Sequence, residues 1–512
     1  MNASPETLNI LFPVPSRAPK SFGLAPSRIP GPNAKSVEAL REYLKDNHRK
    51  RHIFFNDMGF HNHATHHLLA IYALGADAKL LNAAYQTHII YQRPSFPSPG
   101  EITTANWKTH LGDETYYQAY AAFFTELLLK EGPGAVVERY VFSKDVNIGS
   151  ENRINMVGRF LGGFLHPLIH AGYGAEFGQL GMWAEGLAEA CAEQLPVPPV
   201  ALPESLFESG GLTDKLASLK LSEADGGNGS PHALTILARI RADPAFTPAA
   251  LGLPIAPQGD FLAKILAPVG DKLASIVNEW SIETTHEDLE KKLEEVIWMN
   301  SVIYAVAGYG GRHVDPKKEF NADFFFMHLV TSVLFLPSLM AYLTPASSAI
   351  LLKTYLTSSL IVYIAAGAPA LPIAEFFTDT TDSPVQPGVQ PTPTNKFARG
   401  PGASGVTDQH ETVWEEVSSI VTPNPWLPII QTTLVHPNEH LCKLQRALAH
   451  FGAELGETPA GTFAHLVDSG LKGAETLDGT LFVRAAGLTA NKLGWIREGQ
   501  DMRLWDFAGF LN

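Results

Sequence analysis

Apolar residues recur at intervals of three and four positions through long parts of the chain, and strict alternation is rare. The spacing is clearest in residues 66–85, 116–132 and 298–310. This period is that of one face of an α-helix. Gly75 and Gly132 stand at the ends of two of these segments, where a residue without a Cβ closes a last helical turn at low cost. The pattern predicts a mainly α fold with a large helical globular body.

Segments of other composition divide this body. Residues 1–35 contain repeated prolines, so we expect an extended N-terminal arm. Residues 378–409 have almost no large apolar side chain and should form a flexible Pro/Gly-rich insertion. A polar, glycine-rich stretch at 221–230 predicts a surface loop. Between the breaks lie a helical region with the candidate catalytic residues, 36–377, and a helical C-terminal part, 410–512, that we expect to pack on the same body.

Two apolar stretches, 324–343 and 349–366, are about as long as a bilayer crossing. Each contains an ionisable residue, His328 or Lys353, and Pro337 interrupts the first. Neither an aromatic belt nor a basic cluster flanks the short connection between them. We therefore predict a buried helical hairpin and no membrane partner.

Composition narrows the class of protein further. The 512 residues are 45% apolar and 18% charged, which excludes a wholly disordered chain. The 38 Lys and Arg against 52 Asp and Glu leave a net charge of −14, so nucleic acid is not an expected partner. Two cysteines, Cys191 and Cys442, cannot make a disulfide framework, and the first residues lack the apolar run of a signal peptide. We expect an intracellular, cytoplasmic protein, with its oligomeric state open.

Histidine is the residue type whose placement points to chemistry. His61, His63, His66 and His67 fall within seven residues at the head of an apolar helix. Residues three and four apart share a helix face, so His63, His66 and His67 can point together. His67 is in line with the predicted core face and is the best-placed candidate ligand, with His63 as a substitute. The spacing leaves open which of the other three faces a site.

A second pair, His166 and His170, has the i, i+4 spacing by which one helical face offers two imidazoles to a metal ion. Pro167 places His166 at the start of its helix. His328 stands among large apolar residues. A lone buried histidine is more often a core residue with one hydrogen bond, but several without a shared partner would each cost ~1–3 kcal/mol. A metal ion bound by these imidazoles removes that cost.

Lys353 raises a similar question, because few anionic residues accompany it in an apolar helix. Three outcomes are open: the amine reaches the surface, it is buried neutral with a lowered pKa, or it takes up carbon dioxide as a carbamate and supplies an anionic ligand. His436 and His440 repeat the i, i+4 spacing, but Lys443 and Arg446 follow and would repel a cation. We interpret that helix as structural or as a binding surface.

Five sequence blocks stand out together: HNHATHHLLAIYALGA, HPLIHAGYGAEF, FNADFFFMHLVTS, LDGTLFVRAAGLT and GWIREGQDMRLWDF. Taken together they resemble the questin oxidase-like proteins of fungal aromatic polyketide pathways, and the resemblance runs from about Phe54 to Phe510. It implies an oxygen-using oxidoreductase, either a dioxygenase or a monooxygenase. The implied reaction opens the central ring of an anthraquinone or related tricycle, and some members are described as Baeyer–Villiger-type oxidases. The glycine runs AGYGGR and FLGGF do not fit a dinucleotide fingerprint.

Because oxygen is a triplet and reacts slowly with singlet aromatics, an enzyme without flavin needs a redox metal or an electron-rich substrate anion. Imidazole and oxygen ligands suit iron, manganese, copper or zinc. With the resemblance, the hypothesis is a mononuclear non-heme iron(II) centre that opens the ring by C–C cleavage with O2. Its predicted ligands are His67, His166, His170 and His328, with His63 as substitute for one of them and carboxylated Lys353 as a fifth.

Other residues are predicted around this centre. Glu176 and Asp323 would hold imidazole tautomers as hydrogen-bond acceptors. The expected partners are a small aromatic polyketide and O2. A flat pocket for it could use four aromatic residues, which more often are plain core. They are Tyr72, Phe164, Trp298 and Tyr304.

Three other functions stay open. The spacings HxxHH and HxxxH occur in membrane di-iron hydroxylases, although a third box is lacking. A non-enzymatic pigment-binding protein could use histidines to hydrogen-bond hydroxyquinone oxygens. A metal-free Baeyer–Villiger-type oxidase would use NADPH and a base. The exact substrate is not predicted.

Overall fold

The computed structural model describes residues 4–16, 22–148, 154–194, 197, 207, 230–255, 261–311, 319–391 and 422–511. Regular structure in this part of the chain is helical, with three isolated β-bridges and no β-strand. The predicted mainly α fold is confirmed. The core is one continuous set of buried apolar side chains that draws on nearly every helix.

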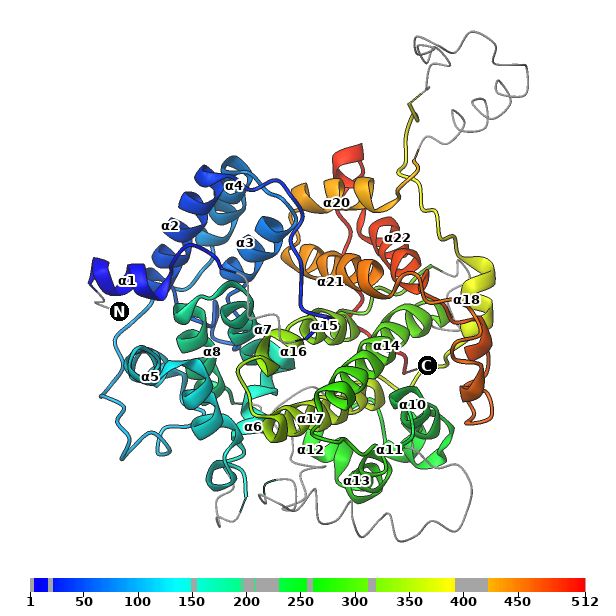
Figure 1. Cartoon of the computed structure of the whole chain (residues 1–512), viewed down its shortest axis with the longest axis horizontal. Coiled ribbons are helices and arrows are strands. Elements are labelled where there is room, and N and C mark those ends of the chain that lie inside the picture. The colour runs from blue at the N-terminus through cyan, green and yellow to red at the C-terminus, as the bar shows by residue number, and fades with distance from the viewer. Residues whose placement is uncertain are drawn as a thin grey trace.

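The N-terminal helices lie side by side at one edge of the molecule (Figure 1). They are α1 (Pro5–Leu11), α2 (Ala34–Lys50), α3 (Ala64–Ala73) and α4 (Ala78–Ile89). The prediction that residues 1–35 are extended throughout was wrong for α1. Pro5 occupies the first turn, where its missing N–H costs nothing, and the Ser4 side chain accepts a hydrogen bond from the Thr7 N–H.

The next helices form a layer under this group, in which α8 packs against both α5 and α7. They are α5 (Tyr117–Val137), α6 (Met156–Phe160), α7 (Gly162–Phe177) and α8 (Leu180–Ala192). Gly132 has a φ of 79° and interrupts α5, close to the predicted helix end. The first turn of α7 is also irregular, because residues 163–165 all have positive φ.

The middle of the chain surrounds two long helices that pack on each other, α14 and α17. The helices are α10 (Ala233–Ala242), α11 (Pro248–Leu251), α12 (Phe261–Leu266), α13 (Gly270–Asn278), α14 (His286–Gly310), α15 (Phe324–Val333), α16 (Leu336–Met340) and α17 (Pro345–Ala365). Of the predicted 221–230 loop, residues 221–229 lie outside the described residues.

Helices α15, α16 and α17 contain the two apolar stretches and pack on one another inside the body, as the predicted hairpin requires. Among the described residues, α17 is the single helix long and apolar enough to cross a membrane, and 89% of its apolar window is buried within the structure. Its interior position is also that of a core helix.

The C-terminal helices cover the remaining side (Figure 1). They are α18 (Ile373–Asp379), α20 (Trp426–Val435), α21 (Glu439–Leu455) and α22 (Leu481–Leu493). Helix α18 extends to residue 379, residues 380–391 contain no regular element, and the rest of the predicted insertion lies outside the described residues. The final segment returns to α15, where Asp506 pairs with Asp323 in a parallel bridge.

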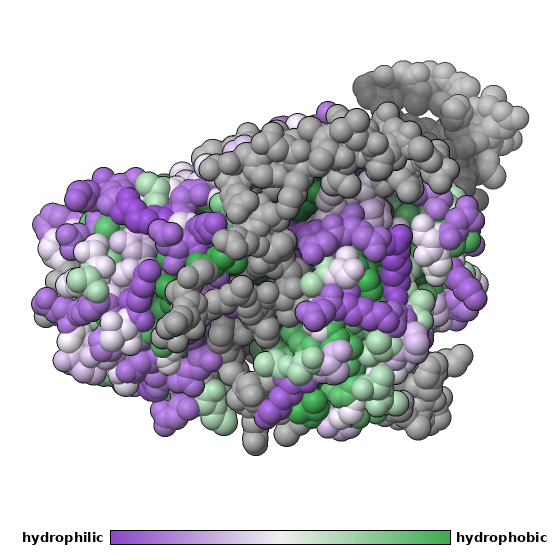
Figure 2. Space-filling model, turned by 90° about the horizontal axis from the view of Figure 1, so that it is seen from below, coloured by the Kyte–Doolittle hydropathy of each residue, from purple (hydrophilic) through white to green (hydrophobic). Residues whose placement is uncertain are grey.

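Four helices from separate parts of the chain meet near the centre, since α21 contacts α3 and α15, and α7 contacts α3 and α15 (Figure 1). Hydrophilic residues cover much of the face seen from below, and apolar residues show between them in patches (Figure 2). The meeting point of α3, α7, α15 and α21 lies within the body and contains most of the histidines considered above.

Candidate metal centre

Each of the four central helices brings one histidine to the same place. His63 is the N-cap residue of α3, His166 follows the irregular first turn of α7, His328 is in the second turn of α15, and His440 is in the first turn of α21. All four are buried. Helix starts converge here, and residues before each one fix its position.

Local capping explains why these helices begin where they do. The Asp323 side chain accepts hydrogen bonds from the N–H groups of Phe325 and Phe326 at the start of α15. The Asn438 side chain accepts one from the His440 N–H at the start of α21. Asn62 accepts one from the first N–H of α3. These caps hold the ends of the three helices at the centre.

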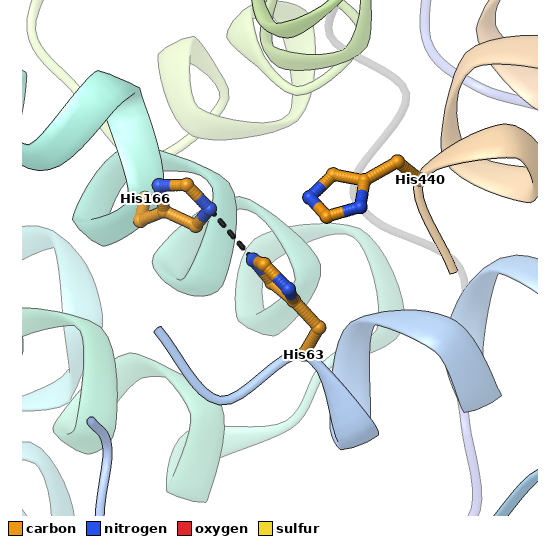
Figure 3. Close-up of side chains that lie close together, drawn as sticks. All are labelled: His63, His166 and His440. Atoms are coloured by element: carbon orange, nitrogen blue, oxygen red, sulfur yellow. Dashed lines mark hydrogen bonds between the residues drawn. The ribbon is translucent and has the colours of Figure 1, made fainter. Parts of the chain in front are cut away.

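Three of the four histidines bring ring nitrogens within ligand distance of one another, and the fourth packs beside them. The nearest ring nitrogens of His63, His166 and His440 all lie within 4.8 Å of each other, and His63 Nε2 is 2.7 Å from His166 Nε2 (Figure 3). The ring of His328 is 5.1 Å from that of His166 and 5.4 Å from that of His440, measured between centroids. We call these four residues the histidine centre.

In every ring of the histidine centre, Nδ1 faces an oxygen. His166 Nδ1 donates to the Gly163 carbonyl at 2.5 Å, and His328 Nδ1 donates to the Phe324 carbonyl at 2.8 Å. Nδ1 of both His63 and His440 lies 3.3 Å from Glu439 Oε1. An imidazole that donates from Nδ1 keeps Nε2 unprotonated and able to bind a metal ion.

The Nε2 atoms, unlike the Nδ1 atoms, do not face oxygens of the described residues that could accept or donate a hydrogen bond. His328 Nε2 and His440 Nε2 are buried with no hydrogen-bond partner in the described chain. With both Nδ1 atoms donating, His63 Nε2 and His166 Nε2 would direct lone pairs at each other across 2.7 Å. A cation between the rings removes that repulsion and satisfies the orphaned atoms, so the donor set fits a metal ion.

Electrostatics keep the imidazoles neutral. Burial, followed by the neighbouring Lys443, lowers the pKa of His328 to about 3 and that of His63 and His440 well below its usual value. Burial and the other histidines do the same for His166. Burial alone would raise the pKa of Glu439, but His440, His88 and Lys443 lower it to about 2. The centre therefore presents four neutral imidazoles, two of which face one carboxylate and two of which face backbone carbonyls.

Lys443 lies next to this centre, one turn after His440. Its side chain is 2% exposed, and its Nζ has no hydrogen-bond partner among the residues that the structure describes. Burial lowers the pKa of Lys443 to about 8, although Glu439 opposes the shift. A buried amine without a partner is costly, so Lys443 is the cationic residue at this site that most needs an explanation.

A questin oxidase-like family model matches residues 60–448, which include all four histidines of the centre. The chain belongs to the questin oxidase-like family. The resemblance drawn from the sequence blocks is thereby confirmed.

Named relatives of this family member are fungal. It is 29% identical to a questin oxidase of Aspergillus fumigatus over 66% of this chain and 72% of that protein. It is 28% identical to the oxidoreductase AflY of Aspergillus parasiticus over 66% of this chain and 64% of that protein. A third relative, the Baeyer–Villiger oxidase mdpL of Emericella nidulans, is 30% identical over 59% of this chain and 64% of that protein. The matches with AflY and mdpL span less than two thirds of those relatives.

Of the predicted ligands in this questin oxidase-like protein, His63, His166 and His328 meet at the centre, and His67 and His170 do not. His67 Nδ1 bonds His88 Nε2 at 2.9 Å on another side of α3. Helix α3 begins at Ala64, so His63 is the residue before the helix and not part of it. His63 therefore reaches the centre from the cap position, whereas His67 lies on a helix face that points elsewhere.

His170 belongs to a neighbouring network. Its Nδ1 is 3.0 Å from His66 Nε2, and its Nε2 is 2.7 Å from Glu185 Oε2, whose other oxygen is 2.6 Å from His48 Nδ1. The hydrogen bonds to both ring nitrogens of His170 leave neither for the centre. His66 and His67 thus have different partners, and of the HxxHH and HxxxH histidines only His63 and His166 meet at the centre.

Lys353 points away from the histidine centre. Its Nζ donates to the Val277 and Trp280 carbonyls, both at 2.6 Å, at the end of α13. Burial lowers its pKa to about 7. The predicted placement of Lys353 as a fifth ligand was wrong, because α17 presents this residue to α13.

The carboxylates predicted to orient the imidazoles have other partners. Glu176 forms a buried ion pair with Arg446, and Asp323 caps α15. The oxygens that face the four Nδ1 atoms of the centre are instead those of Glu439 and of the Gly163 and Phe324 carbonyls. Sequence spacing could not show this, because the carbonyl acceptors come from the turns before His166 and His328.

His440, Glu439 and Lys443 were the residues that sequence reasoning missed. The i, i+4 spacing of His436 and His440 was the available signal, and two following cations argued against it. In the structure, Glu176 neutralises Arg446 and burial weakens the basicity of Lys443. Helix α21, which we interpreted as structural or as a binding surface, thus brings His440 to the histidine centre.

The predicted aromatic pocket is also only partly present. Trp298 and Tyr304 are fully buried in the core, where Trp298 packs on Phe463 and Tyr304 bonds Thr489. Tyr72 is a core residue as well. Phe164 is the member of this set that lies close to the centre, with its ring 6.5 Å from His328.

Proposed function

We propose that this protein is a non-heme iron-dependent oxygenase that opens the central ring of an anthraquinone-type polyketide by C–C cleavage with O2. The observation that carries the proposal is the histidine centre, in which all four Nδ1 atoms face oxygens and nitrogens of three rings converge within 4.8 Å of one another. The Nε2 atoms of His328 and His440 have no hydrogen-bond partner in the described part of the chain. Relatives named questin oxidase and Baeyer–Villiger oxidase support the oxidative half of the proposal.

His63, His166, His328 and His440 would hold the iron. Iron(II) at this position would supply electrons for the reduction of oxygen, which otherwise reacts slowly with a singlet aromatic ring. The surrounding residues would position the ligands and keep water out. Glu439 orients two rings and adds negative charge, while the surrounding apolar core excludes water.

Lys443 takes the role that the sequence suggested for Lys353. Four neutral imidazoles leave a divalent cation without anionic ligands from their own set. As a neutral amine, Lys443 Nζ can bond the carbon of CO2 and release one proton, which gives a carbamate whose single negative charge is shared by two oxygens beside the histidines. This reaction would convert an unpartnered buried amine into a partner for the ion and explains why the amine stands there.

Iron content tests the proposal. Protein purified without chelators should contain about one iron per chain by elemental analysis, and His440→Ala or His328→Ala should remove most of the iron together with ring-opening activity. His67→Ala is the matched control, because it removes an equally buried imidazole that bonds His88 and not the centre. Iron retained by His440→Ala but lost by His67→Ala would contradict the assignment.

A metal-free Baeyer–Villiger-type oxidation that uses NADPH is the second candidate, favoured by the names of several relatives. This candidate predicts that activity survives removal of metal by a chelator, whereas the iron-dependent proposal predicts that activity is lost. Turnover that needs NADPH and survives exhaustive dialysis against a chelator would establish it and exclude iron.

A further inference from the structure

A cavity of about 190 Å³ opens beside the histidine centre. Its walls come from the loop before α3, the irregular turn of α7, α12 and α17. They are mainly apolar and include Phe60, Phe164, Leu262 and Ile361. Polar side chains appear in the same wall at His61, Glu193 and Ser358.

The wall between this cavity and the centre is thin. The ring of His61, which lines the cavity, stacks on the ring of His166 with centroids 4.0 Å apart and planes within 3°. Gly163, also in the wall, accepts the hydrogen bond from His166 Nδ1. A molecule in the cavity would thus lie one imidazole from the centre.

The turn that forms this wall is strained. Gly163, Phe164 and Leu165 have φ values of 51°, 53° and 70°, so two residues with side chains adopt the left-handed conformation in succession. Residues with side chains rarely adopt this conformation, and such strain is concentrated at functional sites. Here it turns Phe164 into the cavity wall and brings the Gly163 carbonyl to His166.

Gly163 also permits the polar part of the wall. A Cβ at this position would lie 2.2 Å from Glu193 Oε2 and 2.8 Å from His61 Nε2. His61 Nε2 in turn lies 3.2 Å from Glu193 Oε2. Only glycine allows this imidazole and carboxyl group to sit directly on the backbone, where they give an apolar cavity one hydrogen-bonding edge.

These features define what the cavity would accept. Apolar walls with one aromatic face suit a flat aromatic molecule. A carboxyl group has about four lone-pair positions, so Glu193 can accept a hydrogen bond from a ligand hydroxyl in addition to the one from His61. Glu189 lies 3.3 Å from the same His61 nitrogen. Glu193 is the one of these two acidic residues that lines the cavity, so a ring bearing a carboxylate would meet an acidic side chain there.

We propose that this cavity binds the organic substrate as a planar hydroxylated aromatic molecule, with Phe164 stacking on its rings and Glu193 accepting a hydrogen bond from a ring hydroxyl. The class of substrate rests on the proposed function. The position and the two specificity residues rest on the cavity. The competing position is at Phe324, which packs against His328 and His440. Phe507 packs on Phe324, and neither phenylalanine lines the cavity.

Equilibrium binding without oxygen tests this inference. The dissociation constants of a dihydroxyanthraquinone and of unsubstituted anthraquinone would be measured by tryptophan fluorescence quenching on the full chain. Phe164→Leu should weaken both ligands by about three- to tenfold, because it removes a stacking ring but keeps an apolar side chain. Glu193→Leu should weaken the dihydroxy ligand by about tenfold and leave the unsubstituted one unchanged, while Glu193→Gln, which keeps a carbonyl acceptor, should restore most of the affinity.

Phe507→Leu is the control and should leave both dissociation constants within about twofold. The inference is overturned if Phe507→Leu weakens binding and Phe164→Leu does not, or if Glu193→Leu affects both ligands equally. Thermal melts of each variant identify unfolding as a cause of lost binding. Binding is measured without turnover, so the two proposals can fail separately. Absence of iron or of activity would overturn the proposed function, whereas the binding results alone decide whether the cavity binds the aromatic ligand.

Discussion

Glu439 is the side chain on which two of the four imidazoles depend. One carboxylate oxygen lies 3.3 Å from Nδ1 of both His63 and His440, which come from helices at opposite ends of the chain. A carboxylate in this position fixes ring orientation and makes the opposite nitrogen a better ligand. Loss of the Glu439 charge should therefore lower the metal affinity more than it lowers the stability of the fold.

We therefore expect Glu439→Gln to weaken iron binding by about 10- to 100-fold, as measured by competition with a chelator of known affinity. Glu454→Gln provides the control, because Glu454 is partly exposed near the other end of α21. Equal iron affinity in the wild-type protein and Glu439→Gln would show that the carboxylate does not orient the rings.

Lys353 gives a pH-dependent prediction that does not involve the centre. Its pKa is about 7 in the folded protein and ~10.4 in an unfolded chain, so the unfolded state binds more protons between these values. The free energy of unfolding should then rise with pH above about 7, by up to ~1.4 kcal/mol per pH unit from this group. Lys353→Met should show a shallower rise in denaturant titrations and unchanged iron content. Loss of iron in that variant would return Lys353 to the ligand set.

At the scale of helices, the sequence pattern was informative where a helix was long and regular. The apolar period located α3, α5 and α14, and three of the four centre histidines were chosen from the right segments. The errors came at helix starts. Whether His63 or His67 faces the centre depends on the residue at which α3 begins, and a shift of that start changes the face that each histidine occupies.

The remaining errors have an electrostatic cause. Sequence gives the formal charges of Lys443 and Arg446 but not their surroundings. Only the fold shows that Arg446 is paired with Glu176 and that Lys443 is desolvated, and these two facts decide whether α21 can approach a cation. The strained turn at residues 163–165 could not be predicted from the sequence either, because no local pattern predicts successive left-handed residues before Pro167.

The irregular turn makes an element-scale prediction about the centre. Gly163→Ala would push a Cβ into Glu193 and His61, and it would move the carbonyl that holds His166 Nδ1. We expect this single methyl to lower iron content and substrate affinity together. Gly461→Ala, at another positive-φ glycine whose added Cβ meets no atom within 4 Å, is the control for backbone strain alone. The same iron content in both variants would contradict the proposed importance of the turn.

For the whole molecule, the C-terminal segment ties the last part of the chain to the helix that carries His328. Phe324 N–H donates to the Asp506 carbonyl at 2.8 Å, Asp506 N–H donates to the Ala322 carbonyl at 2.9 Å, and Phe510 N–H donates to the Ala366 carbonyl at 2.8 Å. The segment lies after residues 60–448, which the family model matches, yet its hydrogen bonds hold the start of α15 in place.

Removal of residues 502–512 should therefore lower the melting temperature by several degrees and accelerate iron release to a chelator. Phe507→Leu, which keeps the backbone bonds, should do neither. An unchanged release rate in the truncated protein would show that α15 keeps its position without the segment.

Because the four histidines come from helices far apart in the chain, neither the N-terminal nor the C-terminal half of the polypeptide contains the whole set. Capture of the ion would be a late event that reports a finished fold, and the ion would then act as a clamp across both halves of the molecule. On the proposed assignment, cells short of iron would accumulate a looser chain that proteases remove sooner, so the supply of the metal would set the amount of enzyme as well as its activity.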